Sequence, residues 1–217
     1  ESLSNDDNRN WWQNNPMTYD WEGKLGQVTL DKNYYKNIDD IFGEGHSLLN
    51  NPNWPDGYIL ENFIPYDYFK GKRVLEIGCG AGLVSSHIAK SGASLMTFKR
   101  FELQNLKADI VQMDAESMTF DDDKFDFVVS WGVIHHSGNM IKIIDEIHRV
   151  LKPGGKAYIM VYNKNSIRYH IYVRFWLGIV KMKLLKYSVP EIVGSITDGH
   201  IARHMTNHEM ERLTSKF

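Results

Sequence analysis

The chain of 217 residues is long enough for one α/β domain with a sizeable hydrophobic core. Hydrophobic residues make up 42% of it and charged residues 24%, which is typical of a globular protein. The net charge of -2 argues against a nucleic-acid partner, and the single cysteine, Cys79, excludes an internal disulfide. The sequence contains no apolar run of transmembrane length and no visible signal peptide, so we expect a cytoplasmic protein.

Residues 1–70 are polar and rich in aromatic side chains, and Asn-Pro and Pro-Asp-Gly turn signals interrupt them. We expect short helices and loops that pack on the main domain, because large rings are rarely left in water in such number. Two interpretations of this N-terminal arm are open: structural support, or a lid in which Tyr19 and Trp21 contact a substrate. The rings concerned are Trp11, Trp12, Tyr19, Trp21 and Trp54.

Strands and helices alternate across residues 71–165. Apolar strands are predicted in RVLEIGC, KADIVQMD, KFDFVVSWG and KAYIMVYN, and a helix is predicted in GAGLVSSHIAKSG. A second helix, in NMIKIIDEIHRVLKPGG, is amphipathic and is expected to end at Pro153-Gly154-Gly155. Its predicted apolar face contains Ile141, Ile144, Ile147, Val150 and Leu151. The alternation predicts an α/β core with a parallel sheet and helices on both faces.

Residues 166–190 are apolar with Arg and Lys interspersed, and this pattern has two interpretations. A basic amphipathic helix of this kind can bind a membrane surface. The commoner outcome is a cap helix whose basic side chains extend to water, and we favour it. We therefore expect residues 166–217 to form a cap and the C-terminal part of the same domain, without stable membrane association.

The loop EIGCGAG, residues 76–82, follows the first buried strand and precedes its helix. Gly78 and Gly80 allow the backbone to turn tightly and to approach a ligand, and the helix offers free N–H groups. Ligands of open α/β sheets bind at the carboxyl ends of strands, so this loop should lie under a cofactor. Leu83 replaces the third small residue of the dinucleotide fingerprint, which argues against NAD. A carboxylate at Glu76 would repel a pyrophosphate, but it suits a cation such as S-adenosylmethionine.

Two further polar segments follow predicted strands. In VQMDAES, Asp114 is placed to accept a hydrogen bond from an adenine amino group; the alternatives are an ordinary turn at a strand end or a helix N-cap. In SWGVIHHSGN, the pair His135-His136 follows the next strand, again on the side where ligands bind.

Four motifs, VLEIGCGAG, MDAES, FDFVVSWGVIHH and EIHRVLKPGG, occur in this order. Together they resemble class I S-adenosylmethionine-dependent methyltransferases, especially the small-molecule group with a WGVLHH motif after the fourth strand. The resemblance covers roughly residues 63–217 and implies a Rossmann-like doubly wound sheet of seven strands. It implies that the glycine loop lies under the methionine and ribose, and that Trp131 and Gly132 face the substrate. The cofactor-binding residues it implies are Glu76, Gly78, Cys79, Gly80, Asp114, Ala115, Glu116, Trp131 and Gly132.

Methyl transfer from a sulfonium is an in-line displacement, for which the protein must bring the nucleophile to about 3–3.5 Å and exclude water. A hydroxyl or ammonium acceptor must also lose a proton to a base. His135 and His136 are the candidates for that base or for substrate positioning, because imidazole titrates near neutral pH. Tyr162 and His204 are further candidates for substrate contact. The other histidines show no metal-ligand spacing, so we expect no metal.

The expected function is methyl transfer from S-adenosylmethionine to a small-molecule acceptor whose nucleophilic atom is undetermined. The main alternative is a non-catalytic or regulatory binding module that keeps the methyltransferase fold. A nicotinamide-dependent oxidoreductase is opposed by Leu83. A lipid or quinone acceptor is compatible with the apolar cap, and a homodimer is left open.

The stretch SGASLMTFKRFELQNLKADI, residues 91–110, runs from a predicted strand directly into a helical pattern, although such a change normally needs a connection. Measured against the family pattern, about ten residues are absent, including the acid that holds the ribose, and Glu102 is a surface charge rather than that acid. Either the protein is a shortened variant, or the sequence omits a segment near Leu95 to Thr97. We favour the omission, because the motifs on both sides are intact. The same question arises near Gly199 to Ile201 and after Phe217, where the last two strands are expected.

Overall fold

The computed structural model of the chain describes residues 10–12, 14, 17, 31–45, 60–91, 111–194 and 202–217. Several sequence predictions lie outside these residues and stay predictions. They concern Tyr19, Trp21, Trp54, Glu102 and the joins near Leu95 to Thr97 and near Gly199 to Ile201.

The chain divides into two compact units whose segments interleave along the sequence. The glycine-loop unit comprises Pro16–Ser130 and Arg149–Tyr158. The histidine unit comprises Glu1–Asn15, Trp131–His148 and Ile159–Phe217. The predicted division into arm, core and cap stays a prediction.

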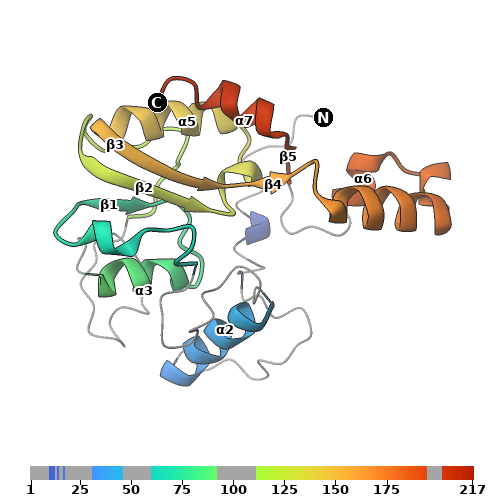
Figure 1. Cartoon of the computed structure of the whole chain (residues 1–217), viewed down its shortest axis with the longest axis horizontal. Coiled ribbons are helices and arrows are strands. Elements are labelled where there is room, and N and C mark those ends of the chain that lie inside the picture. Colours follow the sequence, from blue (N-terminus) through green and yellow to red (C-terminus); the bar gives the residue numbers. More distant parts are fainter. Residues whose placement is uncertain are drawn as a thin grey trace. The chain divides into compact units, whose positions relative to one another are not determined.

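A three-stranded sheet contains β1 (Val74–Glu76), β2 (Phe125–Trp131) and β3 (Leu151–Met160), in the order β1-β2-β3 (Figure 1). β1 and β2 are parallel, and Glu76 pairs in register with Val129. Parallel neighbours need a crossover connection, and α3 supplies a helix between these two strands. The predicted α/β fold with a parallel sheet is confirmed.

The core of the glycine-loop unit is built from β1, β2, α3 and the short 3-10 helix η1. α3 spans Leu83–Lys90, η1 spans Tyr66–Phe69, and the unit also contains α2 (Lys32–Gly45). Phe69 of η1 is fully buried, and its ring centroid lies 4.8 Å from that of Phe127 in β2. Burial of a side chain of this size stabilises the fold by about 1.5–3 kcal/mol.

The segment before Asp114 differs from the sequence prediction. KADIVQMD was predicted as a strand, but its described residues, 111–114, form no strand and Val111 is exposed. A turn follows, in which the Asp114 carboxylate accepts from the N–H of Glu116 at 2.9 Å. Its carbonyl oxygen accepts from the N–H of Ser117 at 3.1 Å. Short polar side chains commonly stabilise such turns in place of a ladder of strand hydrogen bonds.

The amphipathic helix is confirmed as α5 (Met140–Val150), but two residues predicted for its apolar face are wrong, because Leu151 is the first residue of β3 and Ile141 faces water. Ile141 is 57% exposed, whereas Ile143 is buried. The buried arc is that of Met140, Ile143, Ile144, Ile147 and Val150. At about 100° per residue, Ile141 lies roughly 60° beyond this arc.

The Pro153-Gly154-Gly155 sequence does not end α5, because the helix ends at Val150 and β3 begins at the next residue. A side chain at Gly155 would place its Cβ 2.9 Å from the carbonyl oxygen of Lys152 and 3.1 Å from that of Asp126. Glycine is therefore required there chiefly by the carbonyl oxygen of Lys152 in the same strand, with the β2 backbone also close.

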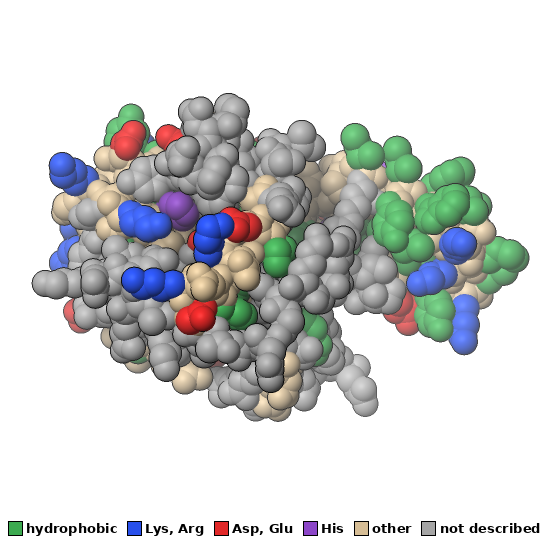
Figure 2. Space-filling model, turned by 90° about the horizontal axis from the view of Figure 1, so that it is seen from below, with side chains coloured by type: hydrophobic (Ala, Val, Ile, Leu, Met, Phe, Trp, Pro, Cys, Tyr) green, Lys and Arg blue, Asp and Glu red, His purple; other side chains and the backbone are tan. Residues whose placement is uncertain are grey.

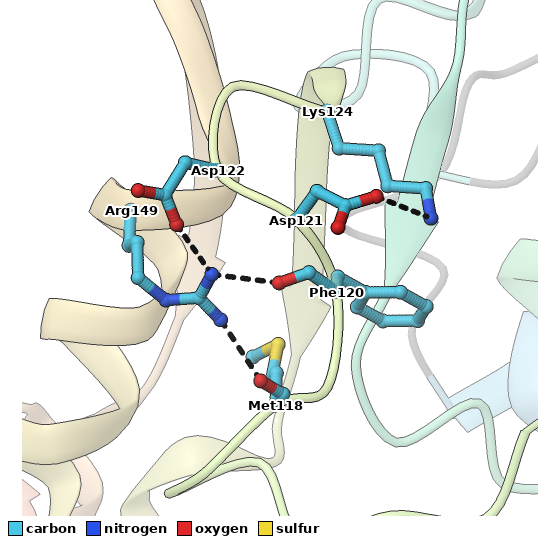
Figure 3. A network of polar contacts seen from close by, with 6 residues as sticks. All are labelled: Met118, Phe120, Asp121, Asp122, Lys124 and Arg149. Carbon is cyan, nitrogen blue, oxygen red and sulfur yellow. Dashed lines mark hydrogen bonds and ion pairs between the residues drawn. The ribbon is translucent and has the colours of Figure 1, made fainter.

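The residues that connect Asp114 to β2 are held by Arg149, within the glycine-loop unit (Figure 3). One guanidinium nitrogen, Nη1, donates to the carbonyl oxygen of Phe120 and to the Asp122 carboxylate, both at 2.7 Å. The other, Nη2, donates to the carbonyl oxygen of Met118 at 2.9 Å. The Arg149 network thus holds this connection at two backbone carbonyl oxygens and one side-chain carboxylate.

The histidine unit contains most of α5 and several further elements. Those that the structure describes after β2 are η2 (Ile134–His136), β4 (Tyr162–Asn163), η3 (Arg168–Val180), η4 (Lys183–Leu185), α6 (Val189–Gly194), β5 (His204–Met205) and α7 (Asn207–Leu213). β4 and β5 are parallel, and Tyr162 pairs with His204. α7 lies beside α5 (Figure 1), with an ion pair between Lys216 and Asp145.

The segment predicted as a cap forms a small cluster of its own. η3 is wound as a π-helix, and its Val173 and Leu177 are buried against Ile192 and Val193 of α6. Gly178 allows η4 to pack closely, since a Cβ there would lie 2.8 Å from Cδ1 of Leu184. Within the described part of the chain, every helix falls short of the length and apolar character that crossing a membrane requires.

Candidate functional site

The loop after β1 has the geometry of a cradle for a ligand. Gly78, Gly80 and Gly82 have φ angles of 72°, 49° and 78°, a left-handed region that only glycine adopts readily. The N–H of Gly82 donates to the carbonyl oxygen of Cys79 at 2.7 Å, which closes the loop. α3 begins at the next residue, so its first N–H groups follow directly on the carboxyl end of β1.

Glu76 ends β1 and is buried. The hydroxyl of Ser85, in the first turn of α3, donates to its carboxylate. Burial raises the pKa of Glu76 to about 7, because it disfavours the charged form by more than the Ser85 hydrogen bond favours it. A buried carboxyl of this kind ionises readily when a cation binds beside it. The loop therefore combines close backbone approach with a charge that suits a cationic ligand.

Asp114 lies in the same unit, at the turn described above, and its side chain is exposed. Ala115 and Glu116 are half-buried. Like the end of a strand, a turn can present backbone and carboxylate groups to a ligand. The geometry is therefore compatible with the predicted contact to adenine. The roles of Asp114, Ala115 and Glu116 stay predictions.

Trp131 and Gly132 belong to the histidine unit and lie where β2 ends. Trp131 is half-buried, and Gly132 has a φ of 72°. The N–H of Gly132 donates to the carbonyl oxygen of Met160 at 3.1 Å, and a Cβ there would lie 3.4 Å from Cε of Met160. The left-handed glycine turns the chain out of β2 and toward η2, which carries the two histidines.

Four of the predicted residues meet in a cluster of rings, which we call the histidine cluster. The ring centroids of His135 and His136 are 4.1 Å apart, and that of Tyr162 lies 4.2 Å from His135. The His204 ring lies 5.2 Å from Tyr162. Trp12, from the N-terminal arm, lies 5.2 Å from His136. The structure thus brings His135, His136, Tyr162 and His204 together, and their predicted roles in catalysis and substrate contact stay predictions.

His135 is fully buried, and within the described residues neither of its ring nitrogens has a hydrogen-bond partner. Burial, with smaller contributions from His136 and His204, lowers the pKa of His135 to about 2. The ring is therefore neutral at physiological pH, with one N–H donor and one acceptor nitrogen. Leaving such groups unpaired is unfavourable by about 1–3 kcal/mol, which a bound molecule with a hydroxyl group would recover.

Two residues that contact the histidine cluster could not be predicted from the sequence. Tyr169 lies beside His204, at 5.4 Å between ring centroids. The backbone N–H of Arg203 donates to the carbonyl oxygen of His135 at 3.1 Å, and its guanidinium donates to the carbonyl oxygens of Ser137 and Gly138. No local pattern marks either residue, although Arg203 directly precedes His204.

Within the described ranges, no group of three or more His, Cys, Asp or Glu side chains is placed to hold a metal ion.

Comparison with protein families gives the class. The family described as "Methyltransferase domain" matches residues 58–217, which is most of the chain. The chain therefore belongs to this methyltransferase family, and the predicted assignment to the class I S-adenosylmethionine-dependent methyltransferases is confirmed.

Two similar curated proteins are both named ubiquinone biosynthesis O-methyltransferase. The protein from Coxiella burnetii is 32% identical over 111 residues, which are 46% of this chain and 47% of the relative. The protein from Pseudomonas aeruginosa is also 32% identical over 111 residues, which are 46% of this chain and 48% of the relative. The chain thus spans about half the length of the curated relatives it matches. A solved S-adenosylmethionine-dependent methyltransferase from Methanosarcina mazei is 22% identical with a TM-score of 0.49, over 75% of this chain and 83% of that one.

Proposed function

We propose that this protein transfers the methyl group of S-adenosylmethionine to a hydroxyl group of a small-molecule acceptor. The observation that carries the proposal is the buried Glu76 at the glycine loop, whose pKa is raised to about 7. S-adenosylmethionine is cationic at its sulfonium and its ammonium group. Binding either centre beside Glu76 stabilises the ionised carboxylate that burial alone disfavours.

In this proposal the glycine-loop unit holds the cofactor. Gly78 and Gly80 let the loop backbone approach it closely, and the N–H groups at the start of α3 offer further donors. Asp114 accepts a hydrogen bond from the adenine amino group. Cys79 contributes its backbone, since its carbonyl oxygen closes the loop.

The histidine cluster binds the acceptor. Its rings suit a flat, partly apolar molecule, and the buried His135 offers a donor and an acceptor to a hydroxyl group. A ring with a pKa of about 2 is too weak a base to remove a hydroxyl proton efficiently near neutral pH. We therefore assign His135 to positioning and leave His136 as the candidate base. Trp12 beside His136 supports the lid interpretation of the N-terminal arm.

The choice of a hydroxyl acceptor follows the two curated relatives, whose names specify O-methylation in ubiquinone biosynthesis. Because the chain spans about half of their length, the acceptor is proposed only as a hydroxylated, partly apolar small molecule.

The test is calorimetric titration with S-adenosylmethionine, followed by uptake of labelled methyl groups by a panel of hydroxylated aromatic compounds. Glu76→Gln should weaken cofactor binding about tenfold or more, since it removes the negative charge. Glu211→Gln, at an exposed carboxylate on α7, is the matched control and should bind as the wild type does. No binding by the wild type, or full-strength binding by Glu76→Gln, would overturn the proposal. Cofactor binding without transfer to any acceptor would instead favour the non-catalytic module.

A further inference from the structure

The segment from η3 to η4 exposes an unusual amount of apolar surface. Ile179 is 61% exposed and Leu185 is 78% exposed. Figure 2 shows this part of the histidine unit as a field of apolar side chains with basic ones between them. The exposed apolar residues are Ile167, Ile171, Tyr172, Phe175, Trp176, Ile179, Val180, Met182, Leu184, Leu185 and Tyr187. We call this set the apolar-basic surface.

The apolar-basic surface is a second apolar face of η3. The first face, with Val173 and Leu177, is already buried against α6. The second presents Ile171, Phe175 and Ile179 at intervals of four residues, beside a parallel row with Trp176. A helix packed on one side of a globular domain normally carries polar residues on its other side. A continuous apolar face that remains exposed marks an interaction site.

The charge around this surface indicates what covers it. Residues 166–190 contain five basic residues and no acidic one, a local charge of +5 in a chain whose net charge is -2. The Nζ atoms of Lys181 and Lys186 lie 5.5 Å and 5.4 Å from the ring centroids of Trp176 and Tyr187. The first acid beyond the segment, Glu191, is engaged by the N–H and hydroxyl of Ser188, both at 2.7 Å. The covering surface must therefore be both apolar and negatively charged.

A second copy of the chain does not fit this requirement, because pairing two such surfaces would bring +5 against +5. A bilayer with anionic lipids does. Its acyl chains accept the apolar side chains, its phosphates attract the lysines, and its interface favours Trp and Tyr rings.

We propose that the apolar-basic surface binds the surface of an anionic lipid bilayer, with η3 lying in the plane of the interface. Lys181 and Lys186 then contact lipid phosphates while Phe175 and Ile179 enter the acyl boundary. The sequence pattern alone favours a cap without stable membrane association. The exposure of the second apolar face of η3 favours binding to a membrane surface instead. This proposal stands on the surface alone and does not depend on the proposed methyl transfer.

The first test is flotation of the full chain with vesicles of phosphatidylcholine, with and without about one third phosphatidylglycerol. The wild type should bind the anionic vesicles and not the neutral ones, and about 0.5 M salt should release most of it. Failure to bind anionic vesicles at low salt would overturn the proposal, as would equal binding to both compositions.

The second test compares matched variants. Ile179→Ser should weaken binding to anionic vesicles about fivefold or more, because the apolar contact is lost. Ile141→Ser, an exposed isoleucine on α5, is the control and should bind as the wild type does. Equal binding by the two variants would contradict the proposal.

The third test reverses charge and does not disturb the apolar packing. Lys181→Glu with Lys186→Glu should reduce binding to anionic vesicles about tenfold or more, with an unchanged circular dichroism spectrum. Retained binding would overturn the proposal. A second result would also overturn it: sedimentation velocity shows a dimer that Ile179→Ser dissociates and that vesicles leave intact. In that case another copy of the chain would cover the surface.

Discussion

The glycine loop and the histidine cluster both contain a buried ionisable side chain whose neutral form is favoured. They differ in how the chain builds them. The glycine loop is one continuous segment, in which Glu76 is bonded by Ser85, nine residues further on. The histidine cluster gathers rings from distant parts of the sequence, and the ring nitrogens of its His135 have no hydrogen-bond partner within the described residues. The first site is preformed by local backbone geometry, whereas the second is assembled by tertiary contacts and left incomplete.

This difference predicts which kind of substitution should affect each site. A local site should respond to changes of its own charge and backbone. An assembled site should respond to the loss of hydrogen-bonding capacity at its centre. The predictions below test the contrast, beginning with the largest expected effect.

The largest effect concerns the pH dependence of stability. The pKa of Glu76 is raised to about 7 in the folded protein. The contribution of protonated Glu76 to the free energy of unfolding is therefore fully present below about pH 4.5 and is lost as the pH rises through 7. Glu76→Gln should abolish that loss, so the ligand-free variant should gain up to about 3 kcal/mol over the wild type between pH 4.5 and pH 8. Denaturant unfolding at both pH values measures the gain. A constant difference between the two proteins would contradict the pKa shift.

The next effect concerns His135. His135→Ala should reduce the rate of methyl transfer about a hundredfold, equivalent to about 2.7 kcal/mol, with cofactor affinity unchanged. His135→Asn retains a donor and an acceptor and should recover part of the rate, as a positioning role requires. Equal loss in both variants would make His135 a base instead. His208→Ala, at an exposed histidine on α7, is the control.

A smaller effect tests whether the glycine-loop unit also depends on distant contacts. Arg149→Ala removes the network that fixes the connection between Asp114 and β2 (Figure 3). Because the guanidinium is partly exposed, we expect the free energy of unfolding to fall by about 2 kcal/mol. Urea unfolding measures it, with Arg212→Ala on α7 as the control. A loss no greater than that of Arg212→Ala would show that the network is dispensable.

The smallest effect is at α7, whose capping box joins Thr206 and Glu209. Thr206→Ala should lower the free energy of unfolding by about 1 kcal/mol, whereas Thr206→Ser should keep the hydroxyl and most of the stability. Thermal unfolding of the two variants, followed by circular dichroism, checks this. Similar melting temperatures for both would leave the cap without a role in stability.

Elements with strong local signals were predictable from the sequence. β1 and β2 are short apolar runs, α3 begins where the left-handed Gly82 ends the loop, and α5 follows a helical period. The wrong predictions concern positions whose burial or backbone conformation depends on tertiary contacts. Ile141 fits a helical pattern but lies beyond the buried arc, and Gly155 serves close backbone contacts within β3 and with β2 rather than a helix stop.

The candidate site was predictable to the same limit. The glycine loop and the pair His135-His136 are visible as motifs. Tyr169 and Arg203 are not, because each acts through a contact distant in sequence: Tyr169 with His204 of β5, and Arg203 with His135 of η2. No local pattern predicts which long-range contacts will satisfy the carbonyl oxygens around two histidines.

The contact between Arg203 and the carbonyl oxygen of His135 also sets an order of construction during synthesis. The last segment of the glycine-loop unit ends at Tyr158, so this unit emerges from the ribosome before the end of the histidine unit does, and domains generally fold as units as they emerge. The histidine cluster must wait for Arg203 and His204, the residues that anchor η2 and pair with β4. In a nascent chain the glycine loop thus forms before the histidine cluster, in which we propose that the acceptor binds.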